Sequence, residues 1–207
     1  MVEAMVENEQ KAETKAVLRK RRVAWGITGS GHRLVETVEI MNQLKEQYQK
    51  NVKITVYLSK AGDQVAKYYQ LIVFLQKHFE SVRVEIDSNT PFLAGALQLG
   101  TFDFLLIAPT TSNTVAKIAM GIADSLLSNS AIMALKAFVP VYIQPSDYEE
   151  GITITKLPGE RELRLKIRKE DVAHVKKLAN MDGVSILEKP EEIYQVFKNH
   201  FKPQQDQ

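Results

Sequence analysis

The stretch FDFLLIAPTTSNTVAKIAMGIADSLL, residues 102–127, decides the fold of this chain. An apolar run typical of a buried strand ends at Pro109, and four small polar residues, TTSN, follow it at 110–113. A long apolar helix pattern then extends over residues 114–137. A strand that passes through a polar turn into a helix is typical of α/β proteins, and such a turn can hold a ligand through hydroxyls and free backbone N–H groups.

The composition is that of an ordinary globular protein, with 207 residues, 44% hydrophobic and 25% charged. No apolar run reaches the ~18–20 residues of a membrane helix, and the charged N-terminus does not resemble a secretory signal, so we expect a cytoplasmic protein. The net charge of +2 is not gathered into a nucleic-acid-binding stripe, and the run RKRR at 19–22 is interpreted as a solvated face. The absence of cysteine excludes disulfides, thiolate nucleophiles and cysteine-ligated metal or iron–sulfur sites within the chain.

Strand and helix patterns alternate along most of the chain. Strands are predicted at residues 22–28, 51–59, 82–86, 102–109 and 138–145, and helices are predicted from Leu34 onward and at 60–79, 90–100 and 114–137. Several strands are apolar throughout, which indicates a parallel sheet covered on both faces. We therefore expect a doubly wound α/β fold of the flavodoxin-like or Rossmann-like type.

The pattern changes near Gly151. An antiparallel pair or an extended arm is predicted over residues 152–168, followed by a helix at 169–181, a strand at 183–187 and a last helix at 189–201. We interpret residues 151–200 as a small α/β extension packed on the same sheet, within one domain that spans residues 21–200. Residues 1–20 are interpreted as a polar arm, and residues 201–207 as a tail.

A second polar loop, GSGH at residues 29–32, follows the first predicted strand. Gly29 and Gly31 allow close approach of a ligand to the backbone, and the following helix N-terminus favours an anion. The loop departs from the dinucleotide fingerprint GxGxxG, because its third glycine position is Leu34. The second strand ends at Ser59 rather than at an acidic residue, and no P-loop is present, so the loop suits a mononucleotide better than NAD.

The loop TTSN and the segment GIAD at 121–124 closely resemble the signature of the FMN-binding flavoprotein family. Pro109, Ser112, Asn113 and Thr114 match that signature, and ITGSGH at 27–32 matches the family's flavin-phosphate loop in kind and position. The resemblance covers residues 22–147. The family includes cysteine decarboxylases, flavin prenyltransferases and archaeal electron-transfer flavoproteins. The alternative is that TTSN is only a helix N-cap with polar turn residues.

The resemblance implies FMN as the cofactor. It implies that neutral hydrogen-bond donors and closely packed backbone surround the phosphate, the ribityl chain and the ring of FMN. Ser59 is expected to form a hydrogen bond with the polyol of the ribityl chain. The twelve expected cofactor-binding residues are Thr28, Gly29, Ser30, Gly31, His32, Ser59, Pro109, Thr110, Thr111, Ser112, Asn113 and Thr114.

The chain departs from the decarboxylase branch of that family. The position of the branch's histidine falls near Gly95, and the segment QPSDYEEG at 144–151 lacks the methionines and tryptophan of its substrate clamp. We therefore do not expect decarboxylation, and we assign no catalytic residue. His32 is expected to contact the cofactor rather than act as a base, and Trp25 to pack in the core rather than on the flavin. His78, His174 and His200 are scattered, so no metal site is expected.

The remaining pattern resembles the archaeoflavoproteins, in which FMN accepts electrons from reduced ferredoxin and passes them on. Any iron–sulfur cluster must then lie on the partner. Residues 151–177 carry eight Lys or Arg against four Asp or Glu, which predicts a docking face for an acidic ferredoxin. Three alternatives stay open: a dihydromethanopterin reductase, a flavin prenyltransferase-like transferase, and a flavin-storage protein. The resemblance also implies a homotrimer or a higher multiple, with the apolar helix at 114–137 as a possible interface.

Overall fold

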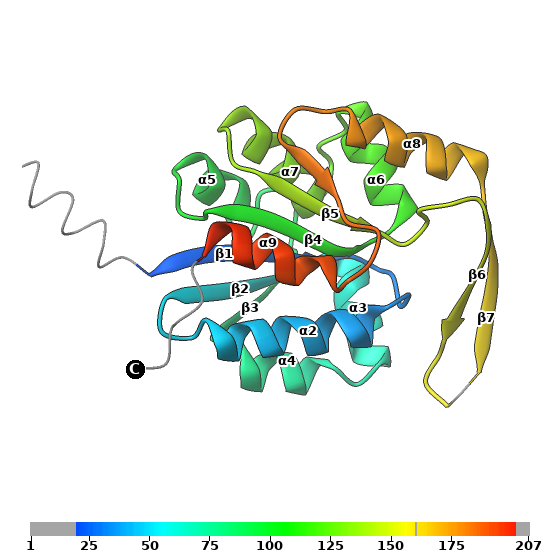
Figure 1. The fold of residues 1–207 in the computed structure, drawn as a ribbon, viewed down its shortest axis with the longest axis horizontal. Helices are drawn as coiled ribbons and strands as arrows, with labels where there is room; N and C mark the ends of the chain where they lie inside the picture. Colours follow the sequence, from blue (N-terminus) through cyan, green and yellow to red (C-terminus); the bar gives the residue numbers. More distant parts are fainter. Residues whose placement is uncertain (1–19, 160, 202–207) are drawn as a thin grey trace, which may run out of the picture.

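The computed structural model describes residues 20–159 and 161–201, so the predicted arm and tail lie outside the described residues except at positions 20 and 201. Its main sheet has six parallel strands in the order β3-β2-β1-β4-β5-β8 (Figure 1). These strands are β1 Arg21–Ile27, β2 Val52–Leu58, β3 Ser81–Val84, β4 Phe104–Thr110, β5 Val141–Pro145 and β8 Val184–Ile186. The expected doubly wound α/β fold is confirmed, with the strand order of the Rossmann-like type.

Helices cover both faces of the sheet. One face packs on α2 Leu34–Gln47, α3 Lys60–Tyr68, α4 Ile72–His78 and α9 Glu192–His200, and the other on α5 Leu93–Gln98, α6 Ser112–Met120, α7 Leu126–Lys136 and α8 Lys169–Ala179 (Figure 1). Alternate residues of each strand face opposite cores: Trp25 enters the first core, and Ala24 enters the second. Within the described residues, no helix is long and apolar enough to cross a bilayer.

Two predicted long helices are each broken in the structure, so those two predictions were wrong. The helix expected at 60–79 divides at Gln70, which has a φ of 58°. The helix expected at 114–137 ends as α6 at Gly121, with a φ of 74°, and restarts as α7 behind the N-cap Ser125. Both breaks are Schellman caps, because Leu71 N–H donates to Ala66 O and Ile122 N–H donates to Lys117 O. Apolar periodicity continues across both caps, which is why it did not reveal them.

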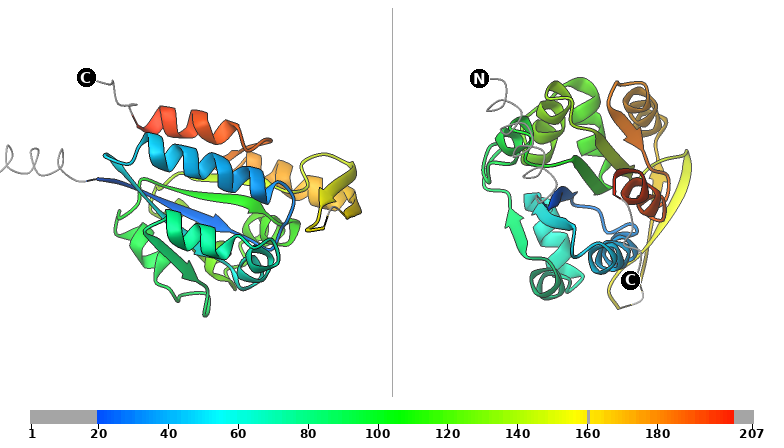
Figure 2. Two further views of the ribbon diagram at one scale, coloured as in Figure 1. Left: turned by 90° about the horizontal axis from the view of Figure 1, so that it is seen from below. Right: turned by 60° about the vertical axis from the view of Figure 1, so that its left-hand side comes forward.

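The C-terminal part divides between the main sheet and a separate hairpin. Strand β8 pairs with β5, and α9 lies beside α2, where Phe201 is buried against Tyr48. Strands β6 Gly151–Lys156 and β7 Glu162–Ile167 form the predicted antiparallel pair, which is a sheet of its own. Figure 2 shows this hairpin standing out beyond the carboxyl ends of the main strands, and it therefore overhangs the edge where the two polar loops lie.

Candidate functional site

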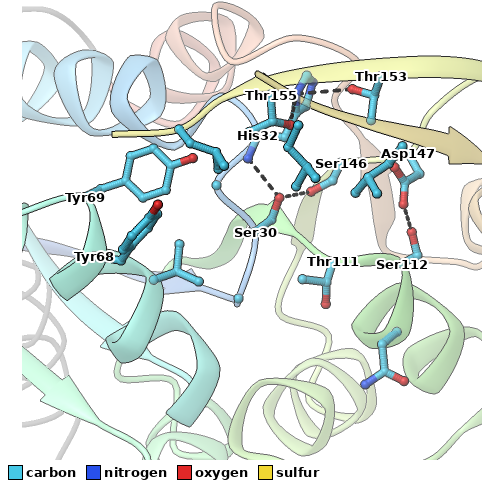
Figure 3. A pocket seen from close by; sticks show the side chains of 17 residues that line it. Ser30, His32, Tyr68, Tyr69, Thr111, Ser112, Ser146, Asp147, Thr153 and Thr155 are labelled. Carbon is cyan, nitrogen blue, oxygen red and sulfur yellow. Dashed lines mark hydrogen bonds between the residues drawn. The ribbon is translucent and has the colours of Figure 1, made fainter. Parts of the chain in front are cut away.

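The candidate site lies at the switch point of the strand order. Strand β1 has β2 on one side and β4 on the other, so the loops after β1 and β4 leave the sheet side by side and diverge. Ligands of open α/β sheets bind in this crevice, outside the carboxyl ends of the strands. A pocket of about 420 Å³ opens there (Figure 3). Its walls are the two loops, the end of α3, the turn after β5 and the inner face of the β6–β7 hairpin.

The loop after β1 supplies one wall and is packed without spare room. Ser30 Oγ accepts hydrogen bonds from the backbone N–H of His32 at 3.2 Å and from Ser146 Oγ at 2.6 Å (Figure 3). A Cβ on Gly31 would lie 2.7 Å from Cζ of Tyr69 and closer still to its hydroxyl. Glycine is therefore required at position 31 for the ring of Tyr69 to lie against the loop.

The loop after β4 is fixed to the first loop by Thr28. Its hydroxyl donates to Pro109 O at 2.8 Å and accepts from the backbone N–H of Thr111 at 2.8 Å. Thr111 is in turn the N-cap of α6, where its side chain accepts from the N–H of Thr114. Ser112 and Asn113, the first residues of α6, line the pocket, and a helix N-terminus at a pocket favours an anionic or polar ligand.

The hairpin closes the pocket from outside the sheet. Thr153 lies opposite Leu165 and Thr155 lies opposite Leu163 in the β6–β7 register, so these four side chains share one face, and all four line the pocket. The hydroxyls of both threonines lie 3.3 Å and 3.4 Å from Nδ1 of His32. The wall is thus half polar and half apolar.

Two tyrosines at the end of α3 tie the hairpin to the body of the protein. The hydroxyl of Tyr69 donates to Lys156 O at 2.9 Å, and Arg161 donates to the hydroxyl of Tyr68 at 3.3 Å. Both rings line the pocket (Figure 3). We call these two hydrogen bonds the tyrosine latch.

Besides the two tyrosines, the titratable side chains that line the pocket are His32 and Asp147. Burial lowers the pKa of His32, the neighbouring Arg33 lowers it further, and Asp147 partly offsets both effects. The side chain is therefore held toward its neutral form, in which it can both donate and accept a hydrogen bond. Asp147 accepts a hydrogen bond from Ser112 Oγ, which fixes the carboxylate against the start of α6 (Figure 3).

Of the twelve residues predicted to bind the cofactor, seven line the pocket: Gly29, Ser30, Gly31, His32, Thr111, Ser112 and Asn113. The other five lie behind these loops and do not line it: Thr28, Ser59, Pro109, Thr110 and Thr114. Thr110 is buried and donates to Ile107 O, and Ser59 caps α3 by accepting from Gly62 N–H. The hydroxyls of Ser59 and Thr110 thus form hydrogen bonds with nearby backbone groups, as the hydroxyl of Thr28 does.

Several pocket residues were missed by the sequence reasoning. Ser146 and Asp147 directly follow β5, so the rule that selected the first two loops would also have selected them. Tyr68, Tyr69 and the hairpin residues carry no comparable local signal, because their place in the pocket depends on how the hairpin folds back.

The other candidates considered from the sequence lie away from the pocket. Trp25 is fully buried, and its ring centroid lies 5.4 Å from that of Phe79. Its indole N–H donates to Ala108 O, so Trp25 is a core residue as expected. His200 is hydrogen-bonded to the hydroxyl of Tyr142 at 2.8 Å. No cluster of potential metal ligands occurs among residues 20–159 and 161–201.

Comparison with known proteins agrees with this geometry. A family model described as Flavoprotein matches residues 11–201. An uncharacterized protein of Methanocaldococcus jannaschii is 47% identical over 186 residues, which cover 90% of this chain and 99% of that protein. The same organism's dihydromethanopterin reductase (acceptor) is 41% identical over 144 residues, or 66% of this chain and 58% of that enzyme, so the chain spans less than two thirds of its length.

Among solved structures, DmrB of Burkholderia xenovorans in complex with FMN superposes with a TM-score of 0.75 and 29% identity, covering 88% of this chain and 96% of DmrB. That protein is described as a cubic protein cage for redox transfer. The resemblance predicted from the loops at 27–32 and 109–114 is thereby confirmed. The chain belongs to the Flavoprotein family.

Proposed function

We propose that this chain is an FMN-containing redox flavoprotein that accepts electrons from reduced ferredoxin and passes them to a downstream acceptor. The observation that carries the proposal is the pocket at the switch point, which combines two hydroxyl-bearing loops with an outer wall that is half polar and half apolar. The relatives point the same way, because DmrB binds FMN and is described as a redox-transfer protein. The cofactor is FMN, the mononucleotide for which these loops are suited.

The residues of the pocket fit such a cofactor. Gly29 and Gly31 let the loop pack closely against Ala61 and Tyr69, and the loop leads into the N-terminus of α2, a place that suits a phosphate. Leu163, Leu165 and Val65 offer an apolar surface for a flat ring. The volume of about 420 Å³ lies within the roughly 300–1,000 Å³ of typical ligand sites.

Individual residues have distinct roles in this proposal. Ser30, Thr111 and Asn113 would hold polar atoms of the cofactor through hydroxyl, amide and backbone donors, and the Ser112 hydroxyl, which donates to Asp147, would accept a hydrogen bond from the cofactor. Neutral His32 would orient a polar edge, since its Nδ1 is already directed at the hairpin threonines. When bound, the flavin supplies the one- and two-electron chemistry, and the protein positions it and limits access of water.

A direct test is reconstitution with FMN. The purified protein mixed with FMN and freed of excess cofactor should retain a yellow visible band. Ser112→Ala should weaken FMN binding about five- to tenfold, the range for loss of one useful hydrogen bond. Ser185→Ala, at an exposed serine of β8, is the matched control and should bind FMN normally. A wild-type protein that retains no flavin would refute the proposal.

The ferredoxin part of the proposal rests on the outer face of the hairpin. Arg164 lies opposite Ile154 and Lys166 opposite Ile152, so two cations and two exposed aliphatic side chains share this face. Cations around a small apolar patch suit an acidic redox partner. Arg168 is less suited to docking than the sequence indicated, because its guanidinium is bound to Asp171 at 2.6 Å at the start of α8.

Charge reversal tests this docking face. Arg164→Glu with Lys166→Glu should slow anaerobic reduction of the bound flavin by reduced ferredoxin at least tenfold at low salt, and less at high salt. Lys45→Glu with Lys50→Glu, on the far side of the molecule near the amino ends of the strands, is the control. Equal reduction rates for both pairs would contradict docking at the hairpin.

A second candidate function is reduction of dihydromethanopterin. It is favoured by the 41% identity to a dihydromethanopterin reductase, although the chain spans only 58% of that enzyme. Turnover of dihydromethanopterin by the FMN-loaded protein would distinguish this reductase from a protein that only relays electrons.

A further inference from the structure

The lining of the candidate flavin pocket has an uneven charge. Asp147 is the one acidic side chain among the described residues that line it, and neither lysine nor arginine belongs to this lining. The imidazole of His32 does not offset the carboxylate fully, because burial and the neighbouring Arg33 lower its pKa and favour the neutral form. The pocket therefore presents a negative charge to whatever it binds.

The carboxylate of Asp147 is held in place from two sides. Ser112 Oγ, at the first residue of α6, donates a hydrogen bond to it (Figure 3). Ser146, the preceding residue, is tied to the loop after β1 by the 2.6 Å hydrogen bond between its hydroxyl and that of Ser30. A helix N-terminus also favours a negative charge. Asp147 is thus a fixed charge where the ends of β1, β4 and β5 meet.

This fixed charge limits how FMN can lie in the pocket. The phosphate of FMN is a dianion, and placing it against a carboxylate is unfavourable. Because Asp147 already occupies the N-terminus of α6, the phosphate is left to the glycine loop after β1, which leads into α2. The part of the cofactor that lies beside Asp147 is then the ring or the adjoining end of the ribityl chain.

We propose that Asp147 lowers the reduction potential of the bound flavin. The oxidised ring is neutral, whereas full reduction at pH 8 adds two electrons and one proton and leaves the ring with one negative charge. A fixed carboxylate disfavours that charge, and charge near the ring is a means by which proteins tune flavins. The inference rests on the proposed redox function, in which a low-potential iron–sulfur protein supplies the electrons.

The test is the midpoint potential of the bound flavin in Asp147→Asn, measured at pH 8 by anaerobic equilibration with a reference dye. Asparagine has the shape of aspartate and can accept the same hydrogen bond from Ser112, but it carries no charge. At a given ambient potential, the ratio of reduced to oxidised flavin should rise at least about tenfold, which corresponds to about 30 mV for a two-electron couple.

Two further variants serve as controls. Asp147→Glu keeps the charge, so it should change this ratio less than about threefold. Asp182→Asn removes an exposed carboxylate between α8 and β8, near the amino ends of the strands, and should leave the potential at the wild-type value. The shift in Asp147→Asn should persist at high salt, because Asp147 is half-buried and salt screens exposed charges more effectively.

Dissociation constants separate an effect of charge from an effect of shape. The shift in potential relative to free FMN equals the ratio of the constants for oxidised and reduced FMN, by thermodynamic linkage. Asp147→Asn should bind oxidised FMN within about threefold of the wild type, and reduced FMN at least about tenfold more tightly. A purely structural role of Asp147 would instead weaken the binding of both forms and leave the potential unchanged.

An unchanged or lowered potential in Asp147→Asn would overturn the inference, as would an equal rise in Asp147→Glu or Asp182→Asn. Asp147→Ser repeats the removal of charge if the asparagine variant retains no flavin. If neither variant binds FMN, the carboxylate holds the cofactor rather than tuning it, and the inference is wrong. Failure of the proposed function looks different: the wild-type protein would retain no flavin, or its flavin would bind but not accept electrons from ferredoxin.

Discussion

Replacing Gly31 with alanine should destabilise the protein by displacing the ring of Tyr69. The new Cβ would lie 2.7 Å from Cζ of Tyr69, a distance that the packing cannot accept without movement. Displacing the ring breaks the 2.9 Å hydrogen bond from its hydroxyl to Lys156 O, which contributes about 0.5–1.5 kcal/mol. Overpacking adds about 1–3 kcal/mol, and the less flexible unfolded chain offsets about 0.4–1 kcal/mol. These contributions add to a net loss of about 0.5–4 kcal/mol, with a central value of about 2 kcal/mol.

The same substitution should change sign when Tyr69 is absent. In a Tyr69→Ala background the clash is removed, so Gly31→Ala should be neutral or stabilising by up to about 1 kcal/mol. Urea unfolding of the cofactor-free protein, at one fixed protein concentration, measures the free energy of unfolding of all four members of this cycle. Gly29→Ala is the matched control, because its Cβ would lie 2.6 Å from Cβ of Ala61 in either background. If Gly31→Ala cost the same with and without the tyrosine ring, the latch would not explain this glycine.

Three further outcomes are expected. Glu85 accepts from the first N–H groups of two helices, Lys60 at 3.0 Å and Leu126 at 2.8 Å, so Glu85→Ala should lower the free energy of unfolding by about 1–3 kcal/mol, whereas the exposed Glu39→Ala should not. Burial lowers the pKa of His200, so its contribution to stability is present above the unfolded pKa of about 6.5 and is lost as the pH falls below it. His200→Gln should therefore flatten the fall in the urea midpoint between pH 7 and 5, and an unchanged slope would contradict this. Light scattering should give a mass of three chains or a multiple of three, as expected from the resemblance and from the cage described for DmrB; a monomer would refute it.

Much of the fold follows from local patterns in the sequence, and the exceptions have a common cause. The segments at 23–27 and 104–109 are apolar throughout, as buried parallel strands must be, and this pattern identifies the two strands without further information. The breaks at Gln70 and Gly121 were missed because each helix restarts in a new direction while apolar residues continue. A capping turn is stabilised by two backbone hydrogen bonds, which leave little trace in the order of side chains.

The site could be predicted only where it is built from the ends of strands. Residues 29–32 and 111–113 were found because parallel strands bring their carboxyl ends to one edge. Ser59 and Thr110 do not line the pocket, because local backbone groups use their hydroxyls, and sequence alone does not reveal that competition. Their contact with the cofactor stays a prediction. The hairpin wall with Thr153 and Leu165 lies more than 100 residues from His32 in the sequence. Rules based on local residue spacing cannot predict a contact between segments so far apart.

The order in which the chain is synthesised gives the hairpin one more consequence. The loop with Ser30 emerges early, but its partners on the far wall, up to Leu165, are added only after most of the chain. At roughly 5–20 residues per second, the early loop waits on the order of ten seconds before its pocket can close. During that interval the glycine loop has no opposite wall, so stable loading of the cofactor should begin only when synthesis is nearly complete. The last part of the chain thus sets the moment at which the protein can acquire its flavin.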